Sequence, residues 1–293
     1  MRKQFVRTIE ELLSKDDKLV LVLGDIGVFG FRNAFKDFPD RTYNIGILEQ
    51  STIGLSAGLA MQHFIPVVHT IAPFIVERSF EQLKNDFGYQ RLGGNFVSVG
   101  ASYDYAALGC THHCPGDVGI LKQIPGMEIV LPGTAAEFDA LFKQSYDNGH
   151  PTYFRLSERQ NETSYPVKFG KAVVVQKGAE ATVIAVGPAL KPTLEACKNK
   201  DVTVLYYTTV APFDSATLKK HAGSGKVLLC EPYYEGGLAH DIIEALKPRP
   251  LRIESVGVPR EFLTRYGTAE EHDEFIGMTA RNISKQLKKL INE

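Results

Sequence analysis

The sequence of 293 residues has no tryptophan, only four cysteines and almost no net charge. It also has no run of about 18 apolar residues, which argues against a membrane-spanning helix. With 33 Lys and Arg against 34 Asp and Glu, the formal net charge of −1 creates no field that would attract a polyanion, so nucleic acid is not expected as a partner. Four cysteines in a chain of this length predict reduced thiols. The charged amino-terminal stretch MRKQFVRTIEELLSKDD lacks the apolar core of a signal peptide, so we expect a cytoplasmic protein.

Short apolar stretches alternate with stretches of helical periodicity along the whole chain. In the strand candidates the apolar residues are continuous rather than every other one, which is typical of parallel sheets covered by helices on both faces. The expected strands are 19–24, 65–71, 96–100, 128–133, 151–157, 171–175, 181–187, 202–207, 226–231 and 251–257. The expected helices are 49–63, 74–87, 134–147, 189–199, 214–221, 237–246 and 279–291.

The length allows two domains, each large enough to bury a core. Residues 158–171 are polar, have few apolar side chains and include Pro166 and Gly170, which is the composition of a linker. We therefore predict an α/β protein of two three-layer α/β/α domains with largely parallel sheets. The domains should span 1–160 and 171–293, with a linker at 161–170.

Loops that follow strands are the first place to look for a site, because ligands of open α/β sheets bind beyond the carboxyl ends of the strands. An apolar stretch, expected to be a strand over 45–48, leads into Glu49 and a helix rich in Gly, Ala and Ser. The helix macrodipole alone favours a carboxylate there by about 0.3–1 kcal/mol. Alternatively, Glu49 is a buried carboxylic acid suited to proton exchange with a ring nitrogen, and the small residues let a flat ligand or another backbone approach.

A second loop, LGCTHHCPGD, carries adjacent histidines at His112 and His113 between Cys110 and Cys114. No second pair of ligands lies at zinc-ribbon spacing, so a structural zinc is disfavoured. Adjacent histidines on such a loop suit hydrogen bonding or acid–base chemistry near pH 7. A merely solvated loop is the alternative.

At the end of the last strand of the first domain lie Arg155 and Arg159. Their guanidinium groups could grip a phosphate through forked hydrogen bonds. Pairing with Glu158 on the surface explains them equally well.

Taken together and in this order, these stretches resemble the transketolase family of thiamine diphosphate enzymes. They are more similar to transketolase and 1-deoxy-xylulose-5-phosphate synthase than to the β subunits of 2-oxoacid dehydrogenases. The most specific piece is the segment that ends in Glu-Gln before the helix of small residues. The resembling stretches are 38–60, 65–86, 110–117, 124–138, 151–160, 235–246 and 257–271.

The resemblance implies roles for individual residues. Glu49 would hydrogen-bond N1′ of the cofactor's aminopyrimidine and act as a catalytic acid. Phe74 would lie against the pyrimidine ring, with Phe80 as a second candidate. His112 and His113 would contact substrate oxygens and assist proton transfers. The family's phosphate-binding arginine corresponds to Arg155 or Arg159.

Two departures from the family pattern affect the expected assembly and substrate. The family binds diphosphate and metal through Gly-Asp-Gly and a later Asn, and Gly24-Asp25-Ile26 is a poor counterpart in which we expect a tight turn. The resemblance thus covers the pyrimidine-binding and C-terminal domains. It implies that a partner subunit supplies the diphosphate site and Mg²⁺ or Ca²⁺, in an α2β2 heterotetramer. Leu108-Gly109-Cys110 replaces the usual Asp-Gly-Pro, which leaves the donor substrate open.

The implied function is that of a split transketolase subunit that transfers a two-carbon ketol unit between sugar phosphates. Alternatives are the β-type subunit of a 2-oxoacid or acetoin decarboxylating enzyme and a carboligase like deoxyxylulose-phosphate synthase. A non-catalytic binding subunit is an alternative of a different class. The joint presence of Glu49, His112, His113 and Arg155 argues against it.

Overall fold

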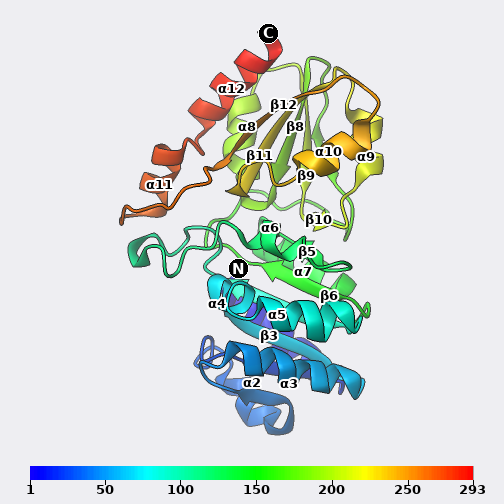
Figure 1. Cartoon of the computed structure of the whole chain (residues 1–293), viewed down its shortest axis with the longest axis vertical. Coiled ribbons are helices and arrows are strands. Elements are labelled where there is room, and N and C mark those ends of the chain that lie inside the picture. Colours follow the sequence, from blue (N-terminus) through cyan, green and yellow to red (C-terminus); the bar gives the residue numbers. More distant parts are fainter. Residues whose placement is uncertain (293) are drawn as a thin grey trace.

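The computed structural model describes residues 1–292 as two α/β lobes stacked end to end (Figure 1). The amino-terminal lobe contains a seven-stranded sheet in the order β10-β5-β6-β4-β3-β1-β2, in which only β10 is antiparallel to its neighbour. Its strands are β1 (Leu19–Leu23), β2 (Thr42–Asn44), β3 (Ile65–Ile71), β4 (Gly94–Val99), β5 (Glu128–Val130), β6 (Pro151–Arg155) and β10 (Thr209–Ala211).

Helices cover both faces of this sheet, and strand β1 shows why. Leu19, Leu21 and Leu23 point into one apolar core, while Val20 and Val22 point into another, and all five are buried. The α-helices of this lobe are α1 (Arg2–Leu13), α2 (Arg32–Asp37), α3 (Glu49–Met61), α4 (Ala72–Val76), α5 (Phe80–Gln82), α6 (Asp117–Leu121) and α7 (Ala135–Ser145). Short 3-10 turns lie at Pro39–Arg41 and Ala106–Leu108, and a π-helix spans Leu83–Tyr89.

The carboxyl-terminal lobe repeats the architecture around a five-stranded sheet in the order β12-β11-β8-β9-β7, with β7 antiparallel. Its strands are β7 (Val173–Gln176), β8 (Ala181–Val186), β9 (Val202–Tyr207), β11 (Lys226–Tyr234) and β12 (Arg252–Val258). Its helices are α8 (Leu190–Cys197), α9 (Ser215–His221), α10 (Ala239–Leu246), α11 (Ala269–Ile276) and α12 (Ala280–Asn292), with a 3-10 turn at Gly187–Ala189. The predicted α/β class with two largely parallel sheets is confirmed.

Two predicted elements are wrong in detail. The chain over 45–48 is no strand: β2 ends at Asn44, and Gly46 adopts a φ of +82° that turns the chain away from the sheet. Asn44 Oδ1 accepts the backbone N–H groups of Asp25 and Gly46, which fixes this turn. Ile47 and Leu48 are consequently exposed.

The helix expected over 74–87 is divided. Helix α4 ends at Val76, and the chain starts again at α5 before the π-helix. The Ser79 hydroxyl donates to the Ile75 carbonyl at 2.7 Å, a local bond that competes with the helical hydrogen bonds. Arg78 lies in this break, just after the end of α4, and its side chain is 45% exposed.

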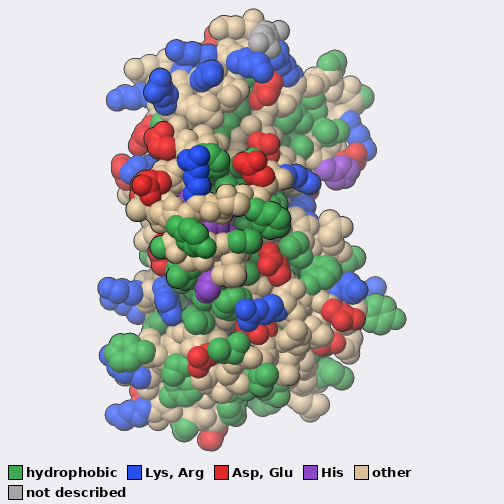
Figure 2. Space-filling model, turned by 60° about the vertical axis from the view of Figure 1, so that its left-hand side comes forward, with side chains coloured by type: hydrophobic (Ala, Val, Ile, Leu, Met, Phe, Trp, Pro, Cys, Tyr) green, Lys and Arg blue, Asp and Glu red, His purple; other side chains and the backbone are tan. Residues whose placement is uncertain are grey.

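The two lobes share backbone hydrogen bonds. Strand β10 follows β9 in the chain but pairs with β5 of the other lobe, and Leu131 N donates to Thr208 O at 2.7 Å. On the opposite side, the loop of residues 100–116 lies beside α11 (Figure 1). Figure 2 shows histidine side chains at the waist between the lobes, surrounded mainly by hydrophobic and uncharged groups. Within residues 1–292, no helix has the length and apolarity to cross a bilayer.

Candidate active site

The predicted site residues lie in loops and helix starts that follow parallel strands of the amino-terminal lobe. Glu49 comes after β2, Phe74 after β3, His112 and His113 after β4, and Arg155 at the end of β6. Because these strands are parallel, their carboxyl ends meet along one edge of the sheet. This one edge therefore carries residues that lie up to 106 positions apart in the sequence, from Glu49 to Arg155.

Glu49 is the first residue of α3 and is buried, with 5% of its surface exposed. Arg78 Nη1 donates to Glu49 Oε1 at 3.0 Å, and the Arg78 side chain is 45% exposed. Glu49 is thus buried as expected. It follows a turn at Gly46 and not the apolar strand that was expected over 45–48.

Phe74 and His112 belong to the same cluster. The Arg78 guanidinium carbon lies 3.8 Å from the centroid of the Phe74 ring, which is a cation–π contact. The His112 ring meets the Phe74 ring edge to face, with centroids 5.5 Å apart. Its Nδ1 lies 2.9 Å from Thr111 Oγ1. Arg78 therefore joins Glu49 to Phe74, and Phe74 in turn contacts His112.

His113 lies on the other side of the loop. It is buried, and its ring meets that of His272 from α11 at a centroid distance of 5.5 Å and an angle of 88°. Within residues 1–292, neither ring nitrogen of His113 makes a hydrogen bond of normal geometry. Burial lowers the pKa of His113, and nearby His272 lowers it further, so the neutral imidazole is favoured near pH 7. The two adjacent histidines thus occupy different surroundings.

The cysteines of this loop also differ. Cys110 is exposed, whereas Cys114 is buried and its thiol donates to Glu77 Oε1 at 3.5 Å. Burial raises the pKa of the Cys114 thiol well above its usual value, so it stays protonated. Within residues 1–292, no group of three or more His, Cys, Asp and Glu side chains is arranged to hold a metal ion.

Arg155 is buried and has internal partners. Its Nε donates to Asp117 Oδ2 at 2.7 Å, and Nη2 donates to the Pro232 carbonyl at 3.1 Å. The Tyr153 hydroxyl donates to the same oxygen of Asp117 at 2.9 Å. The guanidinium therefore fastens α6 and the carboxyl-terminal lobe to β6, and its contact with a substrate phosphate stays a prediction.

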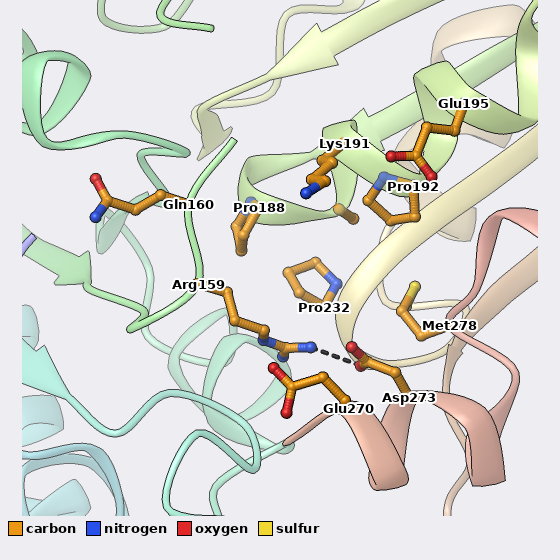
Figure 3. A pocket seen from close by; sticks show the side chains of 11 residues that line it. Arg159, Gln160, Pro188, Lys191, Pro192, Glu195, Pro232, Glu270, Asp273 and Met278 are labelled. Carbon is orange, nitrogen blue, oxygen red and sulfur yellow. Dashed lines mark hydrogen bonds and ion pairs between the residues drawn. The ribbon is translucent and has the colours of Figure 1, made fainter. Parts of the chain in front are cut away.

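Arg159 reaches toward α11, as Figure 3 shows. Its Nη1 donates to Asp273 Oδ1 at 2.6 Å, its guanidinium lies 4.6 Å from the Tyr103 ring centroid, and its Nε is 3.5 Å from Asp104 Oδ1. It lines a cavity of about 330 Å³ whose far wall includes Lys191. The Arg159 guanidinium is thus part of an ion-pair network between the lobes. Its contact with a substrate phosphate stays a prediction.

Phe80 begins α5 and packs against the apolar core around α3 and α4. Of the two predicted aromatic residues, Phe74 is the one whose ring contacts the partner of Glu49. The predicted roles of Phe74 and Phe80 toward a cofactor are not tested by this packing.

Sequence reasoning assigned no role to Arg78, Asp104 or Asp117. One signal for Arg78 is its spacing of four residues from Phe74, which places both on one face of a helical turn. No comparable signal exists for Asp104 and Asp117. Their partners Arg159 and Arg155 lie 55 and 38 residues away and meet them only because β4 and β6 are adjacent.

Comparisons with known proteins agree along nearly the whole chain. The model of the transketolase pyrimidine-binding domain matches residues 1–163, and that of the transketolase C-terminal domain matches residues 170–283. An uncharacterized 33.6 kDa protein in the fasciation locus of Rhodococcoides fascians is 37% identical, over 98% of this chain and 93% of its own length. A subunit of the apulose-4-phosphate transketolase of Phocaeicola vulgatus is 30% identical, over 97% and 95%. The solved structure of a split-gene transketolase, described as an inactive β4 tetramer, superposes with a TM-score of 0.87 at 26% identity, covering 99% of this chain and 97% of that one.

Proposed function

The chain belongs to the transketolase family, and we propose that it is the β-type subunit of a split, thiamine diphosphate-dependent transketolase. In this proposal it acts in the cytoplasm and, with its partner, transfers glycolaldehyde, a two-carbon ketol unit, between sugar phosphates. The observation that carries the proposal is the cluster of Glu49, Phe74 and His112 at the carboxyl edge of the sheet. A buried carboxylate beside an aromatic face is the environment that a flat, nitrogen-containing ring requires.

The residues present fit the cofactor's aminopyrimidine. Glu49 already accepts a hydrogen bond from a planar group, the Arg78 guanidinium, which lies over the face of Phe74. The site therefore has both elements that the ring needs: a buried oxygen acceptor and an aromatic surface. We propose that Glu49 and Phe74 hold the ring and that Phe80 supports the helix break behind them.

When bound, thiamine diphosphate supplies the electron sink for breaking and forming carbon–carbon bonds. Glu49 would hold or exchange a proton at a ring nitrogen, and its burial shields that proton from water. His112 is half-buried beside Phe74, where it would donate to a substrate oxygen. His113 would act from the domain interface, and Arg155 or Arg159 would bind the substrate phosphate.

A partner subunit completes the site in this proposal. The Phocaeicola vulgatus relative is itself one subunit of a transketolase and aligns over nearly its full length, which supports a split organisation. We propose that a transketolase-like N-terminal subunit holds the diphosphate with Mg²⁺ or Ca²⁺, in an α2β2 heterotetramer. The outer face of α3 offers a contact surface, because Gly54 and Gly58 lie there together with exposed Leu55 and Met61.

Reconstitution tests this function. The chain is co-expressed with a transketolase-like N-terminal subunit, supplied with thiamine diphosphate and Mg²⁺, and assayed for ketol transfer from xylulose 5-phosphate to an aldose phosphate. We expect activity from the mixture and none from either subunit alone. Absence of both activity and cofactor binding in a stable complex would refute the proposal. Turnover of pyruvate without turnover of the ketose phosphate would identify a decarboxylating enzyme instead.

A further inference from the structure

One side chain of this subunit already makes the two contacts proposed for the cofactor ring. The Arg78 guanidinium is planar and carries N–H donors. It lies over the Phe74 ring at 3.8 Å and donates to Glu49 Oε1 at 3.0 Å. Both contacts involve the same guanidinium, so Arg78 covers the aromatic face and engages the carboxylate at the same time.

We propose that Arg78 is an internal placeholder for the aminopyrimidine, and that guanidinium and cofactor ring bind Glu49 and Phe74 in turn rather than together. The proposal rests on the proposed function, since it concerns the same cofactor site. It adds a residue that sets cofactor affinity and protects the empty site. The guanidinium must leave before the ring can lie on Phe74 and reach Glu49.

Burial and exposure make the exchange possible. Glu49 is 5% exposed, and a buried carboxylate without a partner is costly, so an empty site needs a counter-ion. The Arg78 side chain is 45% exposed and follows the end of α4 at a break between helices. It can therefore rotate into solvent without disturbing the core, whereas Glu49 and Phe74 stay in place.

The exchange has a thermodynamic consequence. If Arg78 occupies the site in most free molecules, the apparent affinity for the cofactor falls by the fraction of molecules in which the site is open. A half-exposed ion pair and a cation–π contact of ordinary strength correspond to about a five- to thirty-fold effect on the dissociation constant. The placeholder thus weakens cofactor binding while it stabilises the cofactor-free subunit.

The test compares Arg78→Ala, Arg78→Lys and Arg265→Ala in the assembled complex with the partner subunit. Arg78→Lys keeps the charge but removes the planar fork. Arg265→Ala is the matched control, because it removes an exposed arginine that lies 4.3 Å from the Phe275 ring centroid, away from Glu49. Titration calorimetry with thiamine diphosphate and Mg²⁺ gives the dissociation constant, and thermal melting of the isolated subunit gives its stability without cofactor.

We expect Arg78→Ala to bind thiamine diphosphate about five- to thirty-fold more tightly and to melt at a lower temperature without cofactor. Arg78→Lys should lie between it and the wild type, and Arg265→Ala should bind like the wild type. Weaker binding by Arg78→Ala would overturn the inference, because Arg78 would then be a direct cofactor ligand. Unchanged binding with a lower melting temperature would also overturn it and leave a purely structural ion pair. If neither wild type nor variants bind cofactor, the proposed function fails instead.

Discussion

Two buried glutamates, Glu49 of the amino-terminal lobe and Glu231 of the carboxyl-terminal lobe, lie near the carboxyl edges of their sheets and have different partners. Glu49, at the start of α3, is held by a single half-exposed side chain, Arg78. Glu231, in β11, is fully buried and accepts backbone N–H groups from Gly236, Gly237 and Leu238 at 2.8, 3.1 and 3.1 Å. The same residue type thus serves an exchangeable contact in one lobe and a fixed turn in the other.

The surroundings of Glu231 leave its carboxyl group little freedom. A Cβ atom at Gly237 would lie 2.7 Å from the Tyr233 ring and 3.0 Å from Glu231 Oε2, so the turn before α10 is closely packed against the Glu231 carboxyl group. Burial raises the pKa of Glu231 to about 8, although its backbone donors pull that pKa down. The backbone N–H groups that bind Glu231 are fixed in the turn, whereas the Arg78 side chain can rotate away from Glu49.

The largest expected effect comes from Glu49→Gln, which removes the acid but keeps the shape. The assembled enzyme should lose about 10²–10⁴-fold in kcat, because proton exchange with the cofactor ring is lost. Stability should change by less than about 1 kcal/mol, since only a half-exposed ion pair is removed. Steady-state kinetics and thermal melting measure both quantities. Glu81→Gln, at an exposed glutamate, is the control, and a kcat for Glu49→Gln near that of the control would contradict the assignment.

Glu231→Ala should affect stability instead. Three backbone N–H groups, one buried and two part-buried, lose their acceptor, which we expect to lower the free energy of unfolding by about 3 kcal/mol. Urea denaturation followed by circular dichroism measures the loss, with Glu235→Ala at the neighbouring exposed position as control. Any complex that still assembles should retain its cofactor affinity. A stable Glu231→Ala protein with impaired cofactor binding would reverse the contrast with Glu49.

Buried His69 of β3 predicts a pH dependence that belongs to the amino-terminal lobe. Burial lowers its pKa to about 4, below the value of about 6.5 in an unfolded chain. The unfolded state therefore binds the proton first, and stability is lost as pH falls from about 6.5 toward 4. Between pH 7 and pH 5 this single group should cost the wild type about 2 kcal/mol.

The change is isolated by comparing wild type with His69→Asn, which keeps an N–H donor for the Val97 carbonyl that His69 Nδ1 contacts at 2.7 Å. In urea denaturation, the free energy of unfolding of the wild type relative to His69→Asn should fall by about 2 kcal/mol between pH 7 and pH 5. The comparison is needed because Glu231 acts in the opposite direction: its stabilisation is present at low pH and is lost as pH rises toward 8. His63→Asn, at an exposed histidine, should show no such change. Parallel pH profiles of wild type and His69→Asn would exclude His69 as the source.

The smallest expected effect concerns the junction of the lobes. Asp273→Asn weakens the ion pair with Arg159 and the hydrogen bond from Tyr103, and should cost about 1 kcal/mol. Lys247→Met removes an exposed pair with Glu244 and should be nearly neutral. Melting temperatures of the two variants test the order. Equal melting temperatures would mean that the junction contributes no more than an ordinary surface pair.

Much of the candidate site could be predicted because its residues follow strands. Continuous apolar runs located β1, β3, β4 and β6, and a parallel sheet places whatever follows those strands at one edge. Phe74 and His112 are placed at this edge in this way, whereas Glu49 follows β2, which the sequence predicted as a strand at 45–48. The family resemblance indicates which ring these residues would hold. Phe80 shows the limit of periodicity: the expected single helix is interrupted at Ser79, whose hydroxyl bonds to a carbonyl one turn back.

The sequence by itself determined the near-neutral charge, which follows from composition alone. It also determined the fold class and the identity of the groups at the sheet edge, because strand periodicity and turn chemistry are local. Only the tertiary structure decided which partner each group has. Arg155 and Arg159 look alike in sequence, yet one is enclosed with Asp117 and the other spans the lobes to Asp273. His112 and His113 are adjacent, yet they face Phe74 and His272. Such pairings depend on which strands and lobes lie side by side, and burial then fixes whether a charged partner is permanent or, like Arg78, free to leave.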